Sequence, residues 1–140
     1  MFDLKFFLGV QDVEFEQLVD VDSITKGDIL YFASGYVNNA YASATTALLA
    51  GVAQQTVDNS GGSAGDLTCL VQMSPLAIYN VDTADTMTQA YVGYNCAPAS
   101  ATTLTSASQG TDITGVFKIM KMISASKCQG RLNFAGIADT

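Results

Sequence analysis

The apolar residues of this 140-residue chain occur in short runs that are separated by turn-forming residues. The runs are rich in β-branched and aromatic residues or alternate between apolar and polar side chains, which is typical of strands. Most are followed closely by glycine, asparagine, aspartate, serine or proline, as expected for tight turns. We expect strands in Val13–Glu16, Ile29–Phe32, Tyr36–Val37, Leu67–Met73, Leu76–Val81, Val116–Ile123 and Arg131–Phe134. This pattern predicts an all-β fold, a small β-sandwich or barrel.

Four segments do not follow the strand pattern. Ala40–Ala53 is rich in alanine, but its threonines and Gly51 favour a loop that leads into a strand. Asp82–Ala90 has the composition of a single helical turn with Asp82 as its N-cap. Asp58–Ser63 and Ala97–Gly110 are small and polar, and we expect both to be flexible linkers.

The length is that of one ordinary domain, and a hydrophobic fraction of 49% supplies enough apolar surface for a core. We assign residues 1–12 to an extended N-terminal arm and residues 13–140 to a single β domain with long loops. No apolar run approaches the roughly 18 residues that a membrane-spanning helix needs, so we expect no membrane contact.

Charged residues make up only 14% of the chain, against roughly 25% in ordinary soluble domains. Surfaces that become buried between subunits are depleted in charge, which favours a protein that assembles with others. The formal net charge is −7, and a binding groove for phosphates needs an excess of lysine and arginine. We therefore expect no nucleic-acid partner.

The charges are distributed unevenly along the chain. Seven acidic residues lie in the first 28 positions, namely Asp3, Asp12, Glu14, Glu16, Asp20, Asp22 and Asp28. Four of the six basic residues, Lys118, Lys121, Lys127 and Arg131, lie near the C-terminus. Either the two ends form neighbouring strands with paired surface charges, or separate subunits associate head to tail through these charges.

The chain contains no histidine, so a Ser–His or Cys–His nucleophile pair cannot form within it. Cys69, Cys96 and Cys128 are widely spaced and form no CxxC pair, which excludes the common zinc patterns. Cys69 lies in a strand-like run and is expected to be buried as a small apolar residue. We predict no metal, no cofactor and no structural disulfide, as in a protein made in a reducing cytoplasm.

Three other patterns suggest chemistry only weakly. Ser124 and Ser126 are close to lysines, and Asp20-Val21-Asp22 places two acids on one face of a predicted strand. The first pattern has no oxyanion-forming motif beside it, and the second has no EF-hand spacing and nothing that marks a pocket. The glycine-rich run Gly61–Gly65 lacks the Gly-Lys-Ser/Thr ending of a phosphate loop and is expected to be a turn. We therefore expect that the chain is not an enzyme.

One ordered set of short motifs extends over roughly residues 20 to 135. The turn Lys26-Gly27-Asp28 is followed by Gly51-Val52-Ala53 and then by a strand that Gly65 introduces. Thr111–Ile119 and Ile123–Lys127 close the set. In this order the motifs resemble those of the capsid decoration (cement, or head-stabilising) proteins of tailed bacteriophages.

This resemblance implies a β-tulip-like fold and a structural role on the exterior of the virion. Such a protein binds the major capsid protein of an assembled shell, commonly as a homotrimer, and stabilises it. Repeated many times on a shell, modest contacts become strong through multivalency. The alternative is a carbohydrate- or receptor-binding β module of a phage tail or fibre that uses exposed tyrosines as stacking platforms.

The N-terminal arm is the candidate contact with the capsid or with other subunits. Its apolar side chains are Phe2, Leu4, Phe6, Phe7 and Leu8. They are suited to pairing with a neighbouring strand edge, or equally to an ordinary first strand packed on its own core.

Overall fold

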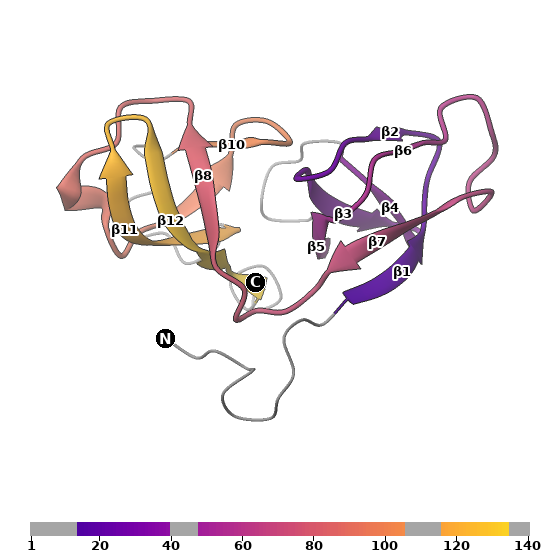
Figure 1. Ribbon diagram of the computed structural model, residues 1–140, viewed down its shortest axis with the longest axis horizontal. Helices are drawn as coiled ribbons and strands as arrows, with labels where there is room; N and C mark the ends of the chain where they lie inside the picture. The colour runs from indigo at the N-terminus through magenta and orange to yellow at the C-terminus, as the bar shows by residue number, and fades with distance from the viewer. Residues whose placement is uncertain (1–13, 40–47, 106–115, 135–140) are drawn as a thin grey trace. The chain divides into compact units, whose positions relative to one another are not determined.

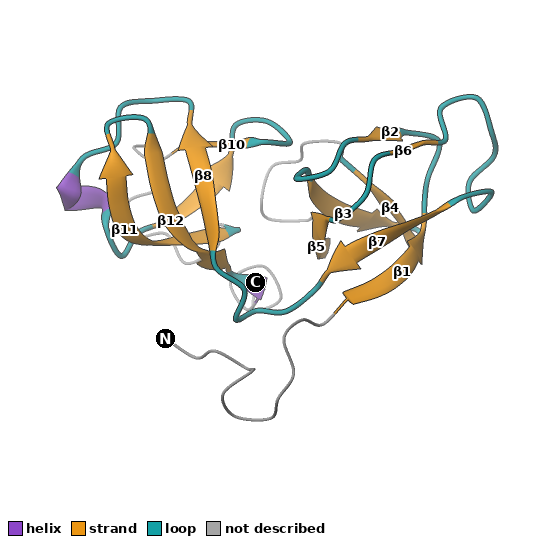
Figure 2. Cartoon of the chain, viewed as in Figure 1, coloured by secondary structure: helices purple, strands orange, loops and turns teal. Residues whose placement is uncertain are grey.

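The computed structural model describes residues 14–39, 48–105 and 116–134. Within these ranges nearly all regular structure is β-strand, and η1 (Gln89–Tyr91) is a single 3₁₀ turn (Figure 2). The predicted all-β class is therefore confirmed. Residues 1–13 lie outside the described ranges, and so does the arm over residues 1–12 with Phe2, Leu4, Phe6, Phe7 and Leu8.

Contacts divide the described chain into two compact units. Residues 14–39 and 48–76 belong to unit 1, and residues 77–105 and 116–134 belong to unit 2. The single β domain expected over residues 13–140 stays a prediction.

Unit 1 is a five-stranded antiparallel sheet with a two-stranded ribbon (Figure 1). Its strands are β1 (Glu14–Leu18), β2 (Ser23–Ile24), β3 (Ile29–Ala33), β4 (Tyr36–Asn38), β5 (Leu48–Ala53), β6 (Val57–Asp58) and β7 (Thr68–Gln72). The sheet order is β1-β7-β5-β3-β4, and β2 pairs with β6. Val19, directly after β1, forms a parallel bridge with Val37 of β4. The two outer strands therefore meet at this point, and the sheet curls around its core.

The turn before β3 is held by a buried carboxylate. Gly27 has a φ of +95°, a conformation that glycine adopts without steric cost. The buried Asp28 carboxylate accepts hydrogen bonds from the Thr25 backbone N–H at 2.9 Å and from Asn39 Nδ2 at 2.8 Å. The Gly27 N–H donates to the Ala53 carbonyl oxygen at 2.9 Å. The Lys26-Gly27-Asp28 turn and the Gly51-Val52-Ala53 strand are thus hydrogen-bonded neighbours.

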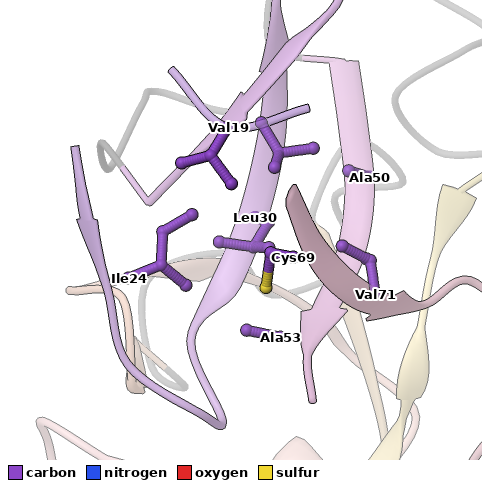
Figure 3. Packing of buried hydrophobic residues seen from close by; sticks show 8 residues of the cluster. Val19, Ile24, Leu30, Ala50, Ala53, Cys69 and Val71 are labelled. Atoms are coloured by element: carbon purple, nitrogen blue, oxygen red, sulfur yellow. The ribbon is translucent and has the colours of Figure 1, made fainter. Parts of the chain in front are cut away.

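The core of unit 1 consists of small and β-branched side chains from most of its strands. The fully buried members are Val19, Ile24, Leu30, Val37, Ala50, Ala53, Cys69 and Val71, most of which are labelled in Figure 3. Burial of Cys69 confirms its expected role as a small apolar residue. Gly51 permits the close approach of β5 and β7, because a Cβ atom at this position would lie 2.1 Å from the Gln72 carbonyl oxygen.

Unit 2 is a small closed barrel. Its strands are β8 (Tyr79–Thr83), β9 (Asn95–Pro98), β10 (Thr103–Thr105), β11 (Phe117–Ser124) and β12 (Lys127–Leu132). They follow the order β10-β8-β12-β11-β9, and β9 pairs with β10 to close the ring. The β8–β10 pair is parallel and the other pairs are antiparallel. The buried side chains of this unit are Met87, Cys96, Leu104, Val116, Phe117, Ile119, Cys128 and Leu132.

Two of the local predictions were wrong within the described residues. Asp82 does not cap a helical turn, because it belongs to β8 and pairs with Lys127 of β12. The 3₁₀ turn begins only at Gln89, after Thr88. Residues 97–105 of the expected linker Ala97–Gly110 contain the end of β9 and all of β10. In both cases pairing with distant strands overrides a weak local preference.

Candidate interaction surface

The outward-facing side of the β11–β12 hairpin carries most of the positive charge of unit 2. Inward and outward positions alternate along β12, where Cys128, Gly130 and Leu132 are buried. Lys127, Gln129 and Arg131 occupy the positions between them and face outward. We call the outward side chains of Lys118, Met120, Lys121, Ile123, Lys127 and Arg131 the β11–β12 face.

Two β-bulges turn apolar side chains onto this face. The register pairs Ile119 with Gly130 and Lys121 with Gln129, so Met120 is an extra residue between them. A second shift makes Ile123 an extra residue in the same strand. A bulge re-aims the side chain that it adds, and Met120 and Ile123 are 48% and 45% exposed. Apolar groups therefore lie exposed among the lysines.

Like charges oppose one another directly on the β11–β12 face. Lys118 pairs with Arg131 in the register, which places their Cβ atoms about 5 Å apart. Like charges in such a pair destabilise a sheet. Among the described residues, no carboxylate forms an ion pair with Lys118, Lys121 or Arg131. An acidic partner would offset this repulsion, which makes the face a candidate binding surface.

The neighbouring strand β8 extends this surface but neutralises only one edge of it. Figure 1 shows β8, β12 and β11 side by side. The Lys127 Nζ atom lies 3.6 Å from Asp82 Oδ1, and Gln129 Nε2 donates to Asn80 Oδ1 at 2.9 Å. The Lys127–Asp82 pair is solvent-exposed and contributes little to stability. The basic groups of Lys118, Lys121 and Arg131 have no ion-pair partner within the described ranges.

An acidic surface lies on β1 in unit 1. The register pairs Glu16 with Leu70 and Leu18 with Thr68, on the side of the sheet opposite the buried Cys69 and Val71. Glu14, Glu16 and Leu18 therefore share the outward side of this strand, and all three are exposed. We call Glu14, Glu16 and Leu18 the β1 face.

Of the two interpretations of the charge distribution, the one in which the chain ends form neighbouring strands does not hold for the described strands. β1 pairs with β7, while β11 and β12 pair with each other and with β9 and β8. Among the described residues, acids instead predominate in unit 1 and basic residues in unit 2. Described unit 1 contains one basic residue, Lys26, against seven acids: Glu14, Glu16, Asp20, Asp22, Asp28, Asp58 and Asp66. Described unit 2 contains two acids, Asp82 and Asp85, against four basic residues.

The weak catalytic candidates have structural roles or lie exposed. Asp20 and Asp22 follow β1 rather than lying in a strand, and each carboxylate accepts a hydrogen bond at 2.8 Å from the N–H of the next residue. Asp22 also accepts from the Asn39 N–H at 2.8 Å. Ser124 and Ser126 lie exposed in and around the β11–β12 turn. Across the described ranges, no three histidine, cysteine, aspartate or glutamate side chains are grouped as metal ligands.

The three cysteines are free and buried. Burial raises the pKa of the Cys69 thiol above its ordinary value of 9.0. Burial, and to a lesser degree the neighbouring Cys128, raises the pKa of Cys96 to about 12. Burial also raises the pKa of Cys128 to about 11. Because the thiolate is the reactive form, none of these thiols has the character of an activated nucleophile.

We expect all three thiols to resist alkylation by iodoacetamide in the folded protein and to react rapidly in denaturant. A raised folded-state pKa means that the native protein keeps protons that the unfolded chain loses above pH 9.0. Stability is therefore expected to fall as the pH rises from about 9 toward 12. Mass spectrometry after timed alkylation measures the first effect, and denaturant unfolding at several pH values measures the second. Fast labelling of native protein at neutral pH would contradict this prediction.

The sequence signal for the β11–β12 face was the cluster of four basic residues near the C-terminus. The alternation of Val116–Ile123 predicted a strand but not its bulges, so the exposure of Met120 and Ile123 was not foreseen.

None of the helical segments in the described ranges has the length and apolar character to cross a membrane.

Comparisons with known proteins identify no relative of this chain. No family model matches it, and neither a curated protein nor a solved structure shows significant similarity.

Proposed function

We propose that this chain is a non-enzymatic structural protein of a tailed-phage virion, which binds the outside of the assembled capsid and stabilises it. The observation that carries the proposal is the presence of exposed large apolar side chains in both units. In unit 1 they are Phe15, Leu18, Val21, Leu48 and Leu67, and in unit 2 they are Ile78, Met120 and Ile123. Apolar side chains on strands and adjoining turns suit broad association with other protein surfaces.

A decoration protein needs several such surfaces because it contacts the shell and often its own copies. Each contact is modest, and multivalency on a repeating shell makes the sum strong. The ordered motifs from Lys26-Gly27-Asp28 to Ile123–Lys127 support the phage assignment by resemblance. In this proposal the major capsid protein is the partner, a homotrimer is the bound form, and the chain is made in the host cytoplasm.

The proposal predicts that the purified chain co-sediments with expanded capsids of its source phage from which it is missing. We expect saturable binding and a rise of several degrees in the temperature at which these capsids release their DNA. Binding should depend on the arm, because its apolar side chains are the predicted shell contact. Replacing Phe2, Leu4, Phe6, Phe7 and Leu8 with serine is expected to abolish co-sedimentation.

The matched control replaces the polar Asp3 and Lys5 of the same arm with serine and should bind like the natural chain. Protection of Cys69, Cys96 and Cys128 from alkylation verifies that each variant is folded, because all three are buried. A natural chain that leaves capsids unbound would contradict the proposed function. Capsid binding that survives the loss of the apolar arm residues would contradict only the role of the arm.

A second candidate function, a glycan- or receptor-binding module, is favoured by one feature of unit 2. The rings of Tyr91 and Tyr94 lie with their centroids 5.5 Å apart and tilted by 39°, and both are partly exposed. Paired aromatic rings at a surface can stack against sugar faces. Glycan-array binding that is lost in Tyr91→Ala, together with an absence of capsid binding, would favour this function over decoration.

A further inference from the structure

The charges that lie exposed on the two units are complementary. Apart from the buried Asp28, described unit 1 has six acids against one basic residue, and described unit 2 has four basic residues against two acids. Of the two described acids of unit 2, Asp82 already lies beside Lys127. Among the described residues of unit 2, the basic groups without a paired carboxylate thus belong to the β11–β12 face.

The β1 face complements the β11–β12 face in charge and in its exposed apolar groups. Glu14 and Glu16 are two positions apart on one strand, which places them about 7 Å from each other. The Cβ atoms of Lys118 and Arg131 are about 5 Å apart across the hairpin. Each face also has exposed apolar groups beside its charges, Leu18 on one and Met120 with Ile123 on the other.

The position of β1 in its sheet makes it accessible to a partner. It pairs with β7 on one side, and it is the first strand in the sheet order β1-β7-β5-β3-β4. Among the described strands, β7 is the only ladder partner of β1, and the bridge between Val19 and Val37 of β4 lies beyond the end of the strand. The glutamates that alternate along β1 keep such an edge soluble when it is free, and they select a basic partner.

We propose that the β11–β12 face of one copy binds the β1 face of a second copy. Glu14 and Glu16 of the second copy would lie against Lys118, Lys121 and Arg131, and Leu18 would lie against Met120 and Ile123. This contact relieves the repulsion between Lys118 and Arg131, which no described carboxylate of the same chain relieves. The two faces are different surfaces, so the association is head to tail and forms a ring where the rotation closes.

This contact is independent of capsid binding, so its test uses the full chain alone. Sedimentation velocity over a wide range of protein concentrations should show concentration-dependent association at low salt. Association should weaken as salt rises, because the Debye length shortens from about 10 Å at 0.1 M to about 3 Å at 1 M. Lys121→Glu is expected to weaken the association about tenfold or more.

The matched control is Lys26→Glu, which makes the same charge change at an exposed position of unit 1. It should associate like the natural chain. A complementary variant, Glu16→Lys, should also lose self-association, and mixing it with Lys121→Glu should restore association between the two variants. Asp58→Lys has the same net charge as Glu16→Lys but lies away from β1, and it should not restore association with Lys121→Glu.

Three results would overturn the proposal. The first is that the natural chain sediments as a monomer at every concentration. The second is that Lys26→Glu weakens association as much as Lys121→Glu does. The third is that Asp58→Lys, mixed with Lys121→Glu, restores association to the same extent as Glu16→Lys. The last two would mean that net charge, and not the two faces, governs association. Capsid binding could persist in any of these cases, so failure here is distinguishable from failure of the proposed function.

Discussion

Replacing Gly130 with alanine is expected to unfold the unit 2 barrel or destabilise it by about 3 kcal/mol or more. A Cβ atom at this position would lie 1.9 Å from the Lys118 carbonyl oxygen and 2.7 Å from Cε1 of the Phe117 ring. The first neighbour is backbone within the β11–β12 ladder, and the second is a fully buried ring. Relief would require both strands to separate and the largest buried side chain of the barrel to move.

Alkylation of individual cysteines measures this effect in each unit separately. Cys96 and Cys128 report on unit 2 and Cys69 reports on unit 1, because each is buried in its own unit. In Gly130→Ala we expect Cys96 and Cys128 to react much faster than in the natural chain. Faster reaction of Cys69 as well would support the single β domain predicted for residues 13–140, whereas continued protection of Cys69 would mean that the units fold separately.

The control for this substitution is Gly61→Ala. Gly61 has no heavy atom within 4 Å of an added Cβ and lies exposed in the loop after β6. Its replacement should leave the reactivity of all three cysteines unchanged. Stability of Gly130→Ala equal to that of the natural chain would contradict the close packing of β11 against β12.

The strands that could be predicted from the sequence are those with a strong local signal. Ile29–Phe32 and Val116–Ile123 are rich in β-branched and aromatic residues, and they correspond closely to β3 and β11. Strands β9 and β10 lack this signal, because Ala97–Gly110 is dominated by small polar residues. They form because barrel closure supplies hydrogen-bond partners from β8 and β11, which are distant in sequence.

The division into two units could not be predicted for a related reason. The core of each unit is made from several short segments of mixed composition. Nothing local in the sequence marks the change from unit 1 to unit 2 after Leu76. The clustering of basic residues near the C-terminus was visible in the sequence, but the opposition of Lys118 and Arg131 depends on the register of the hairpin.

The segment Asp58–Ser63, which we expect from the sequence to be a flexible linker, contains one buried polar side chain that is hydrogen-bonded to the rest of unit 1. Asn59 is only 2% exposed. Its Nδ2 group donates hydrogen bonds to the carbonyl oxygens of Val19 at 3.2 Å, Asp20 at 3.0 Å and Ser63 at 2.9 Å. Its backbone N–H donates to the Asp22 carbonyl oxygen at 2.9 Å. The expectation of a flexible linker is therefore wrong, because one amide joins this loop to the chain that follows β1.

Asn59→Asp is expected to destabilise unit 1 by about 3 kcal/mol or more at neutral pH. The substitution preserves size and shape but replaces a donor of hydrogen bonds with a carboxylate. That carboxylate would face three carbonyl oxygens in a buried site, and both repulsion and desolvation favour its protonated form. Denaturant unfolding measures the loss of stability, and alkylation of Cys69 assigns the loss to unit 1.

The loss of stability in Asn59→Asp should depend on pH. The introduced carboxyl group has a raised pKa in the folded state, because burial disfavours its charge. A raised pKa stabilises the folded state at pH values below the unfolded pKa of about 3.9, and this contribution is lost as the pH rises through the folded pKa. The stability gap between Asn59→Asp and the natural chain should therefore narrow toward pH 4. An equal gap at all pH values would contradict the buried-carboxylate explanation.

Asn80→Asp supplies the matched control, because it makes the same chemical change at an exposed position. Asn80 uses its Oδ1 atom to accept a hydrogen bond from Gln129 Nε2 at 2.9 Å. An aspartate retains this acceptor and stays solvated, so we expect a change within about 0.5 kcal/mol. The two variants make the same chemical change at an exposed and at a buried asparagine. Only Asn59→Asp, which removes a donor to buried carbonyl oxygens, should lower the free energy of unfolding of its unit.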